Sequence, residues 1–254
     1  MCLIEKVFGV DRAALMGAPI AADDNKAVEF IRLVGRRLSG EPLQYLLGEW
    51  EFCGHRLKVG QGVLIPRDDT EVLLRDCLEF LKDKKDAVVI DLCSGSGALA
   101  IAIKKETDAN VCAVEKSADA LPYLCENISL NKADIYVLAD DVIRCCDEFE
   151  DGTFDLILSN PPYVKSGEID TLQKEISFEP RMALDGGADG LDFYRSIISL
   201  WSPKLRAGGM LAFELGEGQY GDVKPLMEAA GFSLIGGSED LGGITRTIHG
   251  IKVQ

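Results

Sequence analysis

The sequence is short of basic residues. Its 254 residues hold 27 Lys and Arg against 42 Asp and Glu, which gives a formal net charge of −15 at pH 7. A surface this negative repels the phosphate backbone over most of its area, so general binding of DNA or RNA is disfavoured. The same charge keeps a protein soluble, and solubility alone is the simplest explanation of it.

Histidine is nearly absent, and the cysteines are not clustered. The chain has only His55 and His249, and none of its eight cysteines is spaced as Cys-x-x-Cys. A structural zinc site needs such clustered ligands, so we expect no metal. Scattered cysteines, one of them (Cys112) inside an apolar run, are typical of reduced thiols in a cytosolic protein.

Long uninterrupted apolar runs are missing too. The longest apolar stretch, 87–103, contains Asp91 and two glycines, so it cannot cross a bilayer. The first six residues lack the charged start and the long apolar core of a signal peptide. We therefore expect a cytoplasmic monomer that binds neither membrane nor nucleic acid directly.

What is present is an ordinary globular composition, 47% hydrophobic and 27% charged, in a chain long enough for one domain and a small appendage. Residues 1–48 have a helical pattern, in which Val28, Ile31, Val34 and Leu38 recur at three- and four-residue spacing. This small helical domain has too little apolar mass to fold alone. We expect it to pack on the rest of the chain or on a partner.

Residues 49–65 have the signature of a β-hairpin linker, because glycines break short alternating apolar runs. From residue 66 to residue 254, strands and helices alternate. We expect strands at 87–92, 110–114, 135–139, 154–159, 209–214, 232–235 and 245–251, with helices at 98–105, 118–131, 191–205 and 220–230. This alternation predicts an α/β fold, a mostly parallel seven-stranded sheet covered by helices on both faces.

Carboxylates and glycines follow the first three strands of this sheet. The first strand runs into Asp91-Leu92-Cys93-Ser94-Gly95-Ser96-Gly97, Glu115 ends the second, and Asp141 follows the third. Ligands of such sheets bind beyond the carboxyl ends of the strands, where glycines let the backbone approach them closely. The carboxylate of Glu115 can accept hydrogen bonds from ribose hydroxyls, and that of Asp141 can accept one from an adenine amino group. The pattern therefore predicts a nucleoside site.

The glycine loop alone leaves three interpretations open. Residues 95–100 also fit the dinucleotide pattern Gly-x-Gly-x-x-Ala, which indicates NAD(P), and a glycine turn can exist without any ligand. Asp91 lies four residues before the first glycine, where a carboxylate would face a bound pyrophosphate badly. It suits the cationic amino acid end of S-adenosyl-L-methionine, so the methyl donor is favoured.

The fourth strand ends in Asn160-Pro161-Pro162-Tyr163. Two prolines fix the backbone and remove two donors, which leaves carbonyl groups unpaired by the chain itself. The Asn160 side chain and the Pro161 carbonyl can both accept hydrogen bonds from a planar NH₂ group, and Tyr163 offers a ring for stacking. Two such acceptors localise the lone pair of an amide nitrogen and turn it toward a methyl group, so we expect Asn160, Pro161 and Tyr163 to act in catalysis.

Together these two motifs resemble class I (Rossmann-like) methyltransferases that act on planar nitrogen. Three further segments narrow the resemblance to the HemK/PrmC family: Gly40-Glu41-Pro42-Leu43-Gln44-Tyr45, Leu64-Ile65-Pro66-Arg67-Asp68-Asp69-Thr70-Glu71, and the run from Glu179-Pro180-Arg181 to Phe193-Tyr194-Arg195. The match runs from about residue 35 to the region of Arg246. Asp68 stands where the family usually has proline.

The resemblance implies an N5-glutamine methyltransferase of peptide chain release factors. Such an enzyme methylates the glutamine of the Gly-Gly-Gln loop of class 1 release factors and leaves S-adenosyl-L-homocysteine. The resemblance further implies that residues 1–48 recognise the release factor. It also implies that the donor contacts Cys93, Ser94, Gly95, Ser96, Gly97, Glu115, Val142 and Asn160, and that the glutamine contacts Asn160, Pro161, Pro162 and Tyr163.

Three other functions use a similar pattern. A glutamine methyltransferase of a ribosomal protein differs in the segment around Pro66 and Arg67. An amine methyltransferase of DNA or RNA needs a basic groove, and Arg36-Arg37 is the only close basic pair near the N-terminus. A donor-binding protein without activity would not need Asn160.

Overall fold

The computed structural model describes residues 2–10 and 23–253. Its first elements are the helices α1 (Cys2–Phe8), α3 (Asp24–Leu38) and α4 (Leu43–Leu47). They pack around a small cluster of buried residues, Leu3, Val7, Leu33 and Leu46. The part of the expected helical region at residues 11–22 lies outside the described residues.

The apolar face of α3 is not the one that the spacing predicts. Of the four residues on the predicted face, Val28, Ile31 and Leu38 are 65%, 69% and 82% exposed, and only Val34 packs against the buried cluster, together with Phe30. The helix carries apolar side chains on two faces, and the short helices α1 and α4 cover only one of them. None of the helices in the described part of the chain covers the second face, which Val28, Ile31 and Leu38 form.

A β-hairpin follows these helices. Its strands β1 (Glu49–Phe52) and β2 (His55–Lys58) pair antiparallel, and Cys53 and Gly54 turn the chain between them with positive φ angles. Asn127 fixes the hairpin to the sheet domain, because its buried side chain accepts from the Lys58 amide at 2.5 Å and donates to the Lys58 carbonyl at 3.0 Å. The same side chain donates to the Ser96 carbonyl at 2.9 Å.

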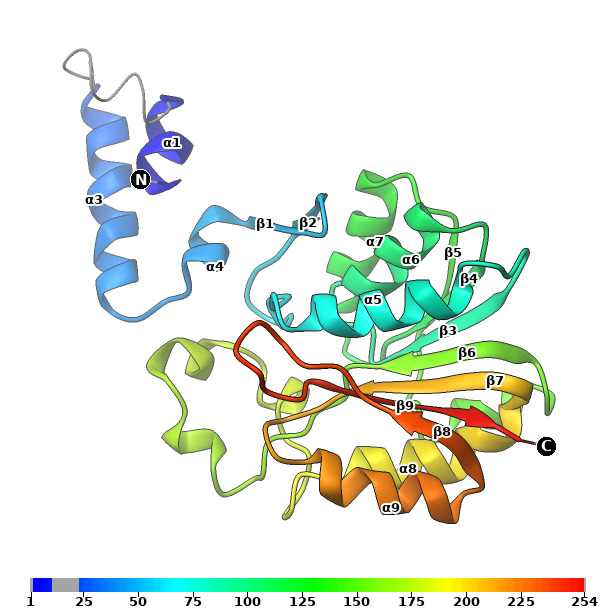
Figure 1. The fold of residues 1–254 in the computed structure, drawn as a ribbon. Helices are drawn as coiled ribbons and strands as arrows, with labels where there is room; N and C mark the ends of the chain where they lie inside the picture. The colour runs from blue at the N-terminus through cyan, green and yellow to red at the C-terminus, as the bar shows by residue number, and fades with distance from the viewer. Residues whose placement is uncertain (1, 11–22, 254) are drawn as a thin grey trace.

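The rest of the chain forms one seven-stranded sheet with the order β5-β4-β3-β6-β7-β9-β8. Its strands are β3 (Val88–Leu92), β4 (Asn110–Val114), β5 (Ile135–Leu138), β6 (Phe154–Ser159), β7 (Leu205–Glu214), β8 (Phe232–Gly236) and β9 (Thr247–Lys252). The strands from β5 to β7 pair in parallel, and β9 lies antiparallel between β7 and β8 (Figure 1). This confirms the predicted fold class.

Helices cover both faces of the sheet. One core joins the sheet to α5 (Thr70–Leu81), α6 (Ala98–Glu106) and α7 (Leu121–Leu130), and a second core joins it to α8 (Asp192–Trp201) and α9 (Tyr220–Ala229) (Figure 1). Successive residues of β3 belong to opposite cores, with Val89 in the first and Ile90 in the second. A strand buried on both faces carries apolar residues at successive positions, as Val88, Val89 and Ile90 do, which is why this run does not alternate.

Three boundaries differ from expectation by three residues or more, and one α-helix was not expected. The helix predicted at 191–205 stops at Trp201, where Pro203 follows in the short 3₁₀ helix η5 (Ser202–Lys204), and β7 begins at Leu205 rather than at Gly209. The helix predicted from residue 118 begins at Leu121, so that Pro122 falls in its first turn. α5 has no counterpart in the prediction.

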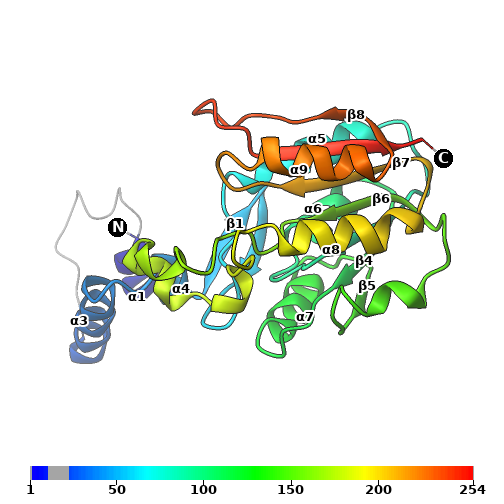
Figure 2. The same ribbon diagram turned by 90° about the horizontal axis from the view of Figure 1, so that it is seen from below.

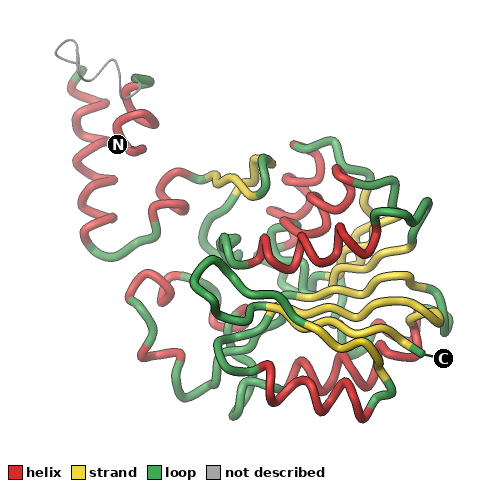
Figure 3. The backbone as a smooth tube through the Cα atoms, in the orientation of Figure 1, coloured by secondary structure: helices red, strands yellow, loops and turns green. Residues whose placement is uncertain are grey.

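The chain between β6 and α8 is mostly loop with three short 3₁₀ helices, η2 (Ile169–Thr171), η3 (Lys174–Phe178) and η4 (Arg181–Ala183) (Figure 3). A further one, η1 (Cys145–Glu148), precedes β6. Figure 2 shows that this connection reaches the N-terminal helices, and Arg37 on α3 pairs with Glu175 on η3 at 2.5 Å. Among the described residues, no helix has both the length and the apolar character needed to cross a bilayer.

Candidate active site

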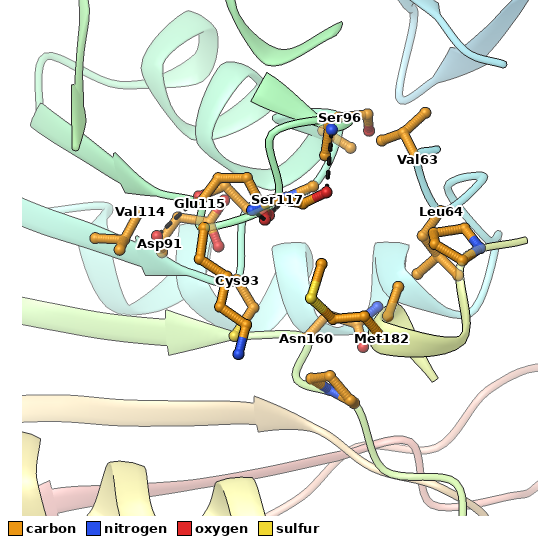
Figure 4. Close-up of a pocket in the computed structure, with 18 of the residues that line it drawn as sticks. Val63, Leu64, Asp91, Cys93, Ser96, Val114, Glu115, Ser117, Asn160 and Met182 are labelled. Atoms are coloured by element: carbon orange, nitrogen blue, oxygen red, sulfur yellow. Dashed lines mark hydrogen bonds between the residues drawn. The ribbon is translucent and has the colours of Figure 1, made fainter. Parts of the chain in front are cut away.

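A cavity lies at the carboxyl ends of β3, β4 and β6. In Figure 4, Asp91, Cys93 and Glu115 lie at one end of it and Val63 and Leu64 at the other, with Asn160 and Met182 along one side. The predicted site residues that line it are Asp91, Cys93, Ser94, Gly95, Ser96, Glu115, Val142, Asn160 and Pro162. Segments far apart in the sequence therefore meet here because parallel strands end at one edge of the sheet.

The glycine loop turns the chain sharply from β3 into α6. Cys93, Gly95 and Gly97 have φ angles of 64°, 55° and 82°, in the left-handed region that favours glycine. Ser94 braces the loop, since its hydroxyl donates to the Asp91 carbonyl at 2.8 Å and its carbonyl accepts from the Gly97 amide at 2.8 Å. A Cβ atom at Gly97 would lie 2.6 Å from Leu124, so the loop needs glycine there.

Glu115 is held rigidly at the end of β4. One carboxylate oxygen, Oε2, accepts from the Gly95 amide at 2.8 Å, and the other, Oε1, accepts from the Ser117 amide at 2.7 Å. Each oxygen keeps a second lone pair for a ligand. A fixed carboxylate beside a glycine loop can accept two hydrogen bonds from the vicinal hydroxyls of a ribose.

Asp91 is a buried carboxylate without a partner. It is 1% exposed, and neither of its carboxylate oxygens has a hydrogen bond among the described residues. Burial raises the pKa of this group to about 7, with the charge of Glu115 acting in the same direction, whereas the Ser94 hydroxyl and the Ala100 amide act on it in the opposite direction from distances too long or angles too poor for a hydrogen bond. An orphaned buried carboxylate at a cavity wall is stabilised by a cation, so this end of the cavity fits a ligand with an ammonium group.

Asp141 lies beside the cavity rather than in its wall. Asp140 and Val142 line the cavity, whereas the Asp141 carboxylate lies 3.3 Å from the Lys116 ammonium and accepts from the Ile143 amide at 3.0 Å. Burial acts to raise the pKa of Asp141, but these two contacts together with Arg144 hold it below its usual value. Two adjacent aspartates cannot be told apart by sequence alone, since only the turn after β5 decides which one faces inward.

Asn160 lies at the cavity, and one of the two polar atoms of its side-chain amide already has a hydrogen-bond partner. Its Nδ2 donates to the Thr70 hydroxyl at 3.3 Å, which leaves Oδ1 free to accept. Pro161 and Tyr163 do not line the cavity, and Tyr163 instead donates its hydroxyl to Glu214 at 3.1 Å and packs against the second core. The predicted stacking face of Tyr163 is therefore not presented to the cavity in this conformation.

Several cavity residues were missed at the sequence level. Two walls near Asn160 come from the segments 62–66 and 180–183, and Glu179 joins them, since it accepts from the Ile65 amide at 3.1 Å and pairs with Arg67. Most of these residues lie inside the segments that carried the family resemblance, but nothing in their spacing indicated a shared ion pair. Thr70, Lys116 and Phe193 also line the cavity.

Within residues 2–10 and 23–253, no three His, Cys, Asp or Glu side chains gather in a way that could hold a metal ion. The chemistry available at the cavity is that of hydrogen-bond acceptors and buried charge. This arrangement suits the positioning of two organic groups next to each other.

Two family models match the sequence. The methyltransferase small domain matches residues 68–187, and the PrmC N-terminal domain matches residues 1–48. Among solved structures, a methyltransferase from Pyrococcus furiosus has a similar fold, with a TM-score of 0.58 and 16% identity, over 91% of this chain and all of that one.

Relatives are similar over nearly the whole chain. The release factor glutamine methyltransferase of Thermodesulfovibrio yellowstonii is 38% identical over 97% of this chain and 89% of that protein. The release factor glutamine methyltransferase of Geobacter sulfurreducens is 38% identical over 98% of this chain and 87% of that protein. The chain belongs to the family of release factor glutamine methyltransferases.

Proposed function

We propose that the protein transfers a methyl group from S-adenosylmethionine to the N5 nitrogen of the glutamine in the Gly-Gly-Gln motif of class 1 peptide chain release factors. Family membership supports this reaction. The observation that carries it is the position of Asn160, whose free Oδ1 lies at the same cavity as the orphaned carboxylate of Asp91 and the fixed carboxylate of Glu115.

The donor fits the wall between β3 and β5. Asp91 would pair with its ammonium group, and Glu115 would accept from its ribose hydroxyls. The loop Cys93–Gly97 would lie along it, with Val142 and the carboxylate of Asp140 at the adenine end. Bound there, S-adenosylmethionine supplies a methyl group on a positively charged sulfur.

The acceptor amide would bind at the end of β6. The Oδ1 of Asn160 and the Pro161 carbonyl accept from the two hydrogens of the glutamine NH₂ group, with Pro162 and Tyr163 fixing the loop. These bonds oppose delocalisation of the nitrogen lone pair and direct it toward the methyl group. The methylated nitrogen is strongly acidic and releases its proton to water, so no histidine or other strong base is needed.

The N-terminal helices, residues 1–48, would recognise the release factor. The face of α3 formed by Val28, Ile31 and Leu38, which we call the α3 stripe, is apolar and exposed. Exposed apolar side chains that gather on one helix face favour contact with a protein. The contact between Arg37 and Glu175 places this unit beside the connection that walls the cavity.

The test is transfer of labelled methyl from S-adenosylmethionine to a purified release factor. We expect label on the intact factor and none on a factor whose Gly-Gly-Gln glutamine is replaced by alanine. Label on a ribosomal protein or on nucleic acid, with none on the release factor, would contradict the proposal. Binding of S-adenosylhomocysteine without any transfer would indicate a donor-binding protein instead.

A further inference from the structure

The loop 160–163, which would present Asn160 to the acceptor amide, is held at its first end by the sheet. Ser159, the last residue of β6, pairs with both neighbouring strands, and its buried hydroxyl donates to the Leu92 carbonyl at 2.6 Å. Two prolines follow Asn160, and their rings fix φ at both positions. The position of this loop therefore depends on what holds its second end, at Tyr163.

The second end is held by the side chain of Gln219, the residue just before α9. Its Nε2 donates to the Tyr163 carbonyl at 3.0 Å and to the Gly190 carbonyl at 3.3 Å. Its Oε1 accepts from the Gly216 amide at 2.9 Å. A backbone carbonyl only accepts and a backbone amide only donates, so these partners fix which way the Gln219 amide points. Gln219 is 9% exposed and lies outside the cavity wall, and nothing in the reaction as proposed above uses it.

Two glycines let the neighbouring backbone approach the same part of the loop closely. A Cβ atom at Gly186 would lie 2.7 Å from the Cα of Tyr163 and 2.8 Å from the carbonyl oxygen of Pro162. A Cβ atom at Gly190 would lie 2.5 Å from the carbonyl oxygen of Tyr163 and 2.8 Å from the Nε2 of Gln219. A larger residue at either position would therefore displace the loop or the amide that holds it.

We propose that Gln219 is a positioning residue for methyl transfer, which acts by holding the Tyr163 carbonyl. The loop fixed in this way presents the Oδ1 of Asn160 and the Pro161 carbonyl to the acceptor amide. The inference rests on the proposed function, because it assigns what keeps these two acceptors in place. A displacement of about 1 Å between reacting groups can lower a rate about 100-fold. In this role the backbone of Tyr163 serves the reaction, and its ring need not face the cavity.

Two substitutions disturb the second end of the loop by opposite means. Gln219→Met keeps the length of the side chain and removes both of its polar atoms, so the Tyr163 carbonyl is released. Gly186→Ala leaves the Gln219 amide in place and adds a methyl group that pushes on Tyr163. In an assay with release factor, we expect each variant to lower kcat about 100-fold. The Kd of S-adenosylhomocysteine should stay within about threefold of wild type, which also shows that the variants are folded.

Asn131→Leu is the matched control. The half-buried amide of Asn131 also donates to two backbone carbonyls, those of Arg56 and Asn127, both at 2.9 Å, and none of these three residues lines the cavity. Its loss should leave kcat within twofold of wild type. An equal loss of kcat in Gln219→Met and Asn131→Leu would overturn the inference. A kcat within twofold of wild type in either Gln219→Met or Gly186→Ala would also overturn it and leave the proposed function intact.

A second measurement needs no turnover, because the peptide bond that Gln219 holds can be observed by NMR. In protein labelled with ¹³C at the tyrosine carbonyl and with ¹⁵N-valine, the coupling between the two isotopes selects only valines that follow a tyrosine. The sequence has two of them, Val137 and Val164. The amide of Val164 shares its peptide bond with the Tyr163 carbonyl, and its signal is identified by its loss in Val164→Ile.

The Val164 signal should shift in Gln219→Met and stay in place in Asn131→Leu. Val137, which lies on β5, should keep its shift in Gln219→Met and serves as the internal reference. An unchanged Val164 signal in Gln219→Met would overturn the inference. If wild-type protein transfers no methyl to release factor, the proposed function fails, and these spectra still decide whether Gln219 holds this peptide bond.

Discussion

At the scale of single residues, the buried carboxylate of Asp91 is energetically unfavourable when no ligand is bound. A carboxylate normally loses its proton near pH 4, and burial raises the pKa of this one to about 7. The folded chain therefore holds a proton that the unfolded chain has lost, so this residue makes stability fall as pH rises from about 4 to about 7. A bound ammonium group would remove that cost by pairing with the charge.

Asp91→Asn should therefore make the protein more stable while weakening its binding of the methyl donor. At pH 8 we expect the free energy of unfolding to rise by up to about 4 kcal/mol, since the penalty of about three pKa units is gone. The Kd of S-adenosylmethionine should increase at least tenfold. Denaturant unfolding and calorimetry at pH 6, 7 and 8 measure both effects.

The pH series provides the control for this prediction. In the wild-type protein the donor should bind more weakly as the pH falls from 8 to 6, because Asp91 takes up a proton, and the variant should lose this dependence. Equal donor affinity in the two proteins at pH 8 would show that Asp91 does not meet the ammonium group.

Asn160 should affect turnover far more than donor binding. In the proposed reaction Asn160→Ala removes an acceptor for the reacting NH₂ group, so we expect kcat to fall about 100- to 1,000-fold while the Kd of the donor changes less than threefold. Steady-state kinetics and calorimetry measure the two quantities. A parallel loss in both would mean that Asn160 only shapes the donor pocket.

At the scale of elements, the α3 stripe gives a prediction about the protein substrate. Ile31→Asp places a charge on a side chain that is 69% exposed, so stability should be unaffected. If the α3 stripe binds the release factor, the KM for release factor should rise about tenfold in Ile31→Asp, with kcat at saturation unchanged. Lys26→Gln changes the charge by the same amount in the first turn of α3, at a spacing of two and five residues that turns it away from Val28 and Ile31, and should leave KM within twofold. Equal KM values for the two variants would exclude the stripe.

The ion pair between Arg67 and Glu179 joins two walls of the cavity. The Glu179 side chain is 1% exposed and that of Arg67 is 37% exposed. Because solvent reaches one partner, we expect Arg67→Met to cost about 1–3 kcal/mol, less than the loss of a fully buried partner. The main cost is the charge of Glu179 left alone, so the double variant Arg67→Met/Glu179→Gln should be more stable than Arg67→Met. Denaturant unfolding of wild type, Arg67→Met, Glu179→Gln and the double variant measures this. A double variant whose free energy of unfolding falls by the sum of the two single losses would contradict the prediction.

Most elements of the sheet could be predicted from sequence, because continuous apolar runs between polar loops define strands buried on both faces. The helix α5 could have been found, since Val72, Leu73, Leu74, Cys77 and Leu81 are buried at helical spacing. The start of β7 could not, because Gly208 and Gly209 look like the end of a turn, whereas the strand runs through them. Local propensity does not report pairing with a neighbour such as β6.

The site was predictable to the level of segments but not of contacts. Residues that follow parallel strands must meet at one edge, which placed Asp91, Glu115 and Asn160 together correctly. Long-range partners carry no such signal: Thr70 and Asn160 are 90 residues apart, and Ile65 and Glu179 are 114 apart. The buried side of α3 likewise depends on which neighbouring helices are long enough to cover it.

At the scale of the whole molecule, the net charge of −15 affects which substrates can approach the protein. It disfavours nucleic acid as the substrate of the Asn-Pro-Pro-Tyr pocket, and it would attract a basic protein domain over distances of about 10 Å at ordinary ionic strength.

Salt should therefore act on one substrate and not on the other. Between 50 and 300 mM NaCl, we expect the KM for a release factor with a basic catalytic domain to rise several-fold through slower association, and the Kd of the donor to stay within twofold. Sodium sulfate at matched ionic strength should have the same effect as NaCl if screening is the cause. A KM independent of salt would mean that surface charge serves solubility alone.

Asn127 connects the β-hairpin to the glycine loop. One buried amide holds both the Lys58 backbone in the hairpin and the Ser96 carbonyl in the glycine loop. A ligand that stiffens the loop would therefore also act on the hairpin, whose strand β1 continues from the N-terminal helices. We expect ordered binding: the methyl donor binds first, and the release factor then binds a protein whose hairpin is already rigid.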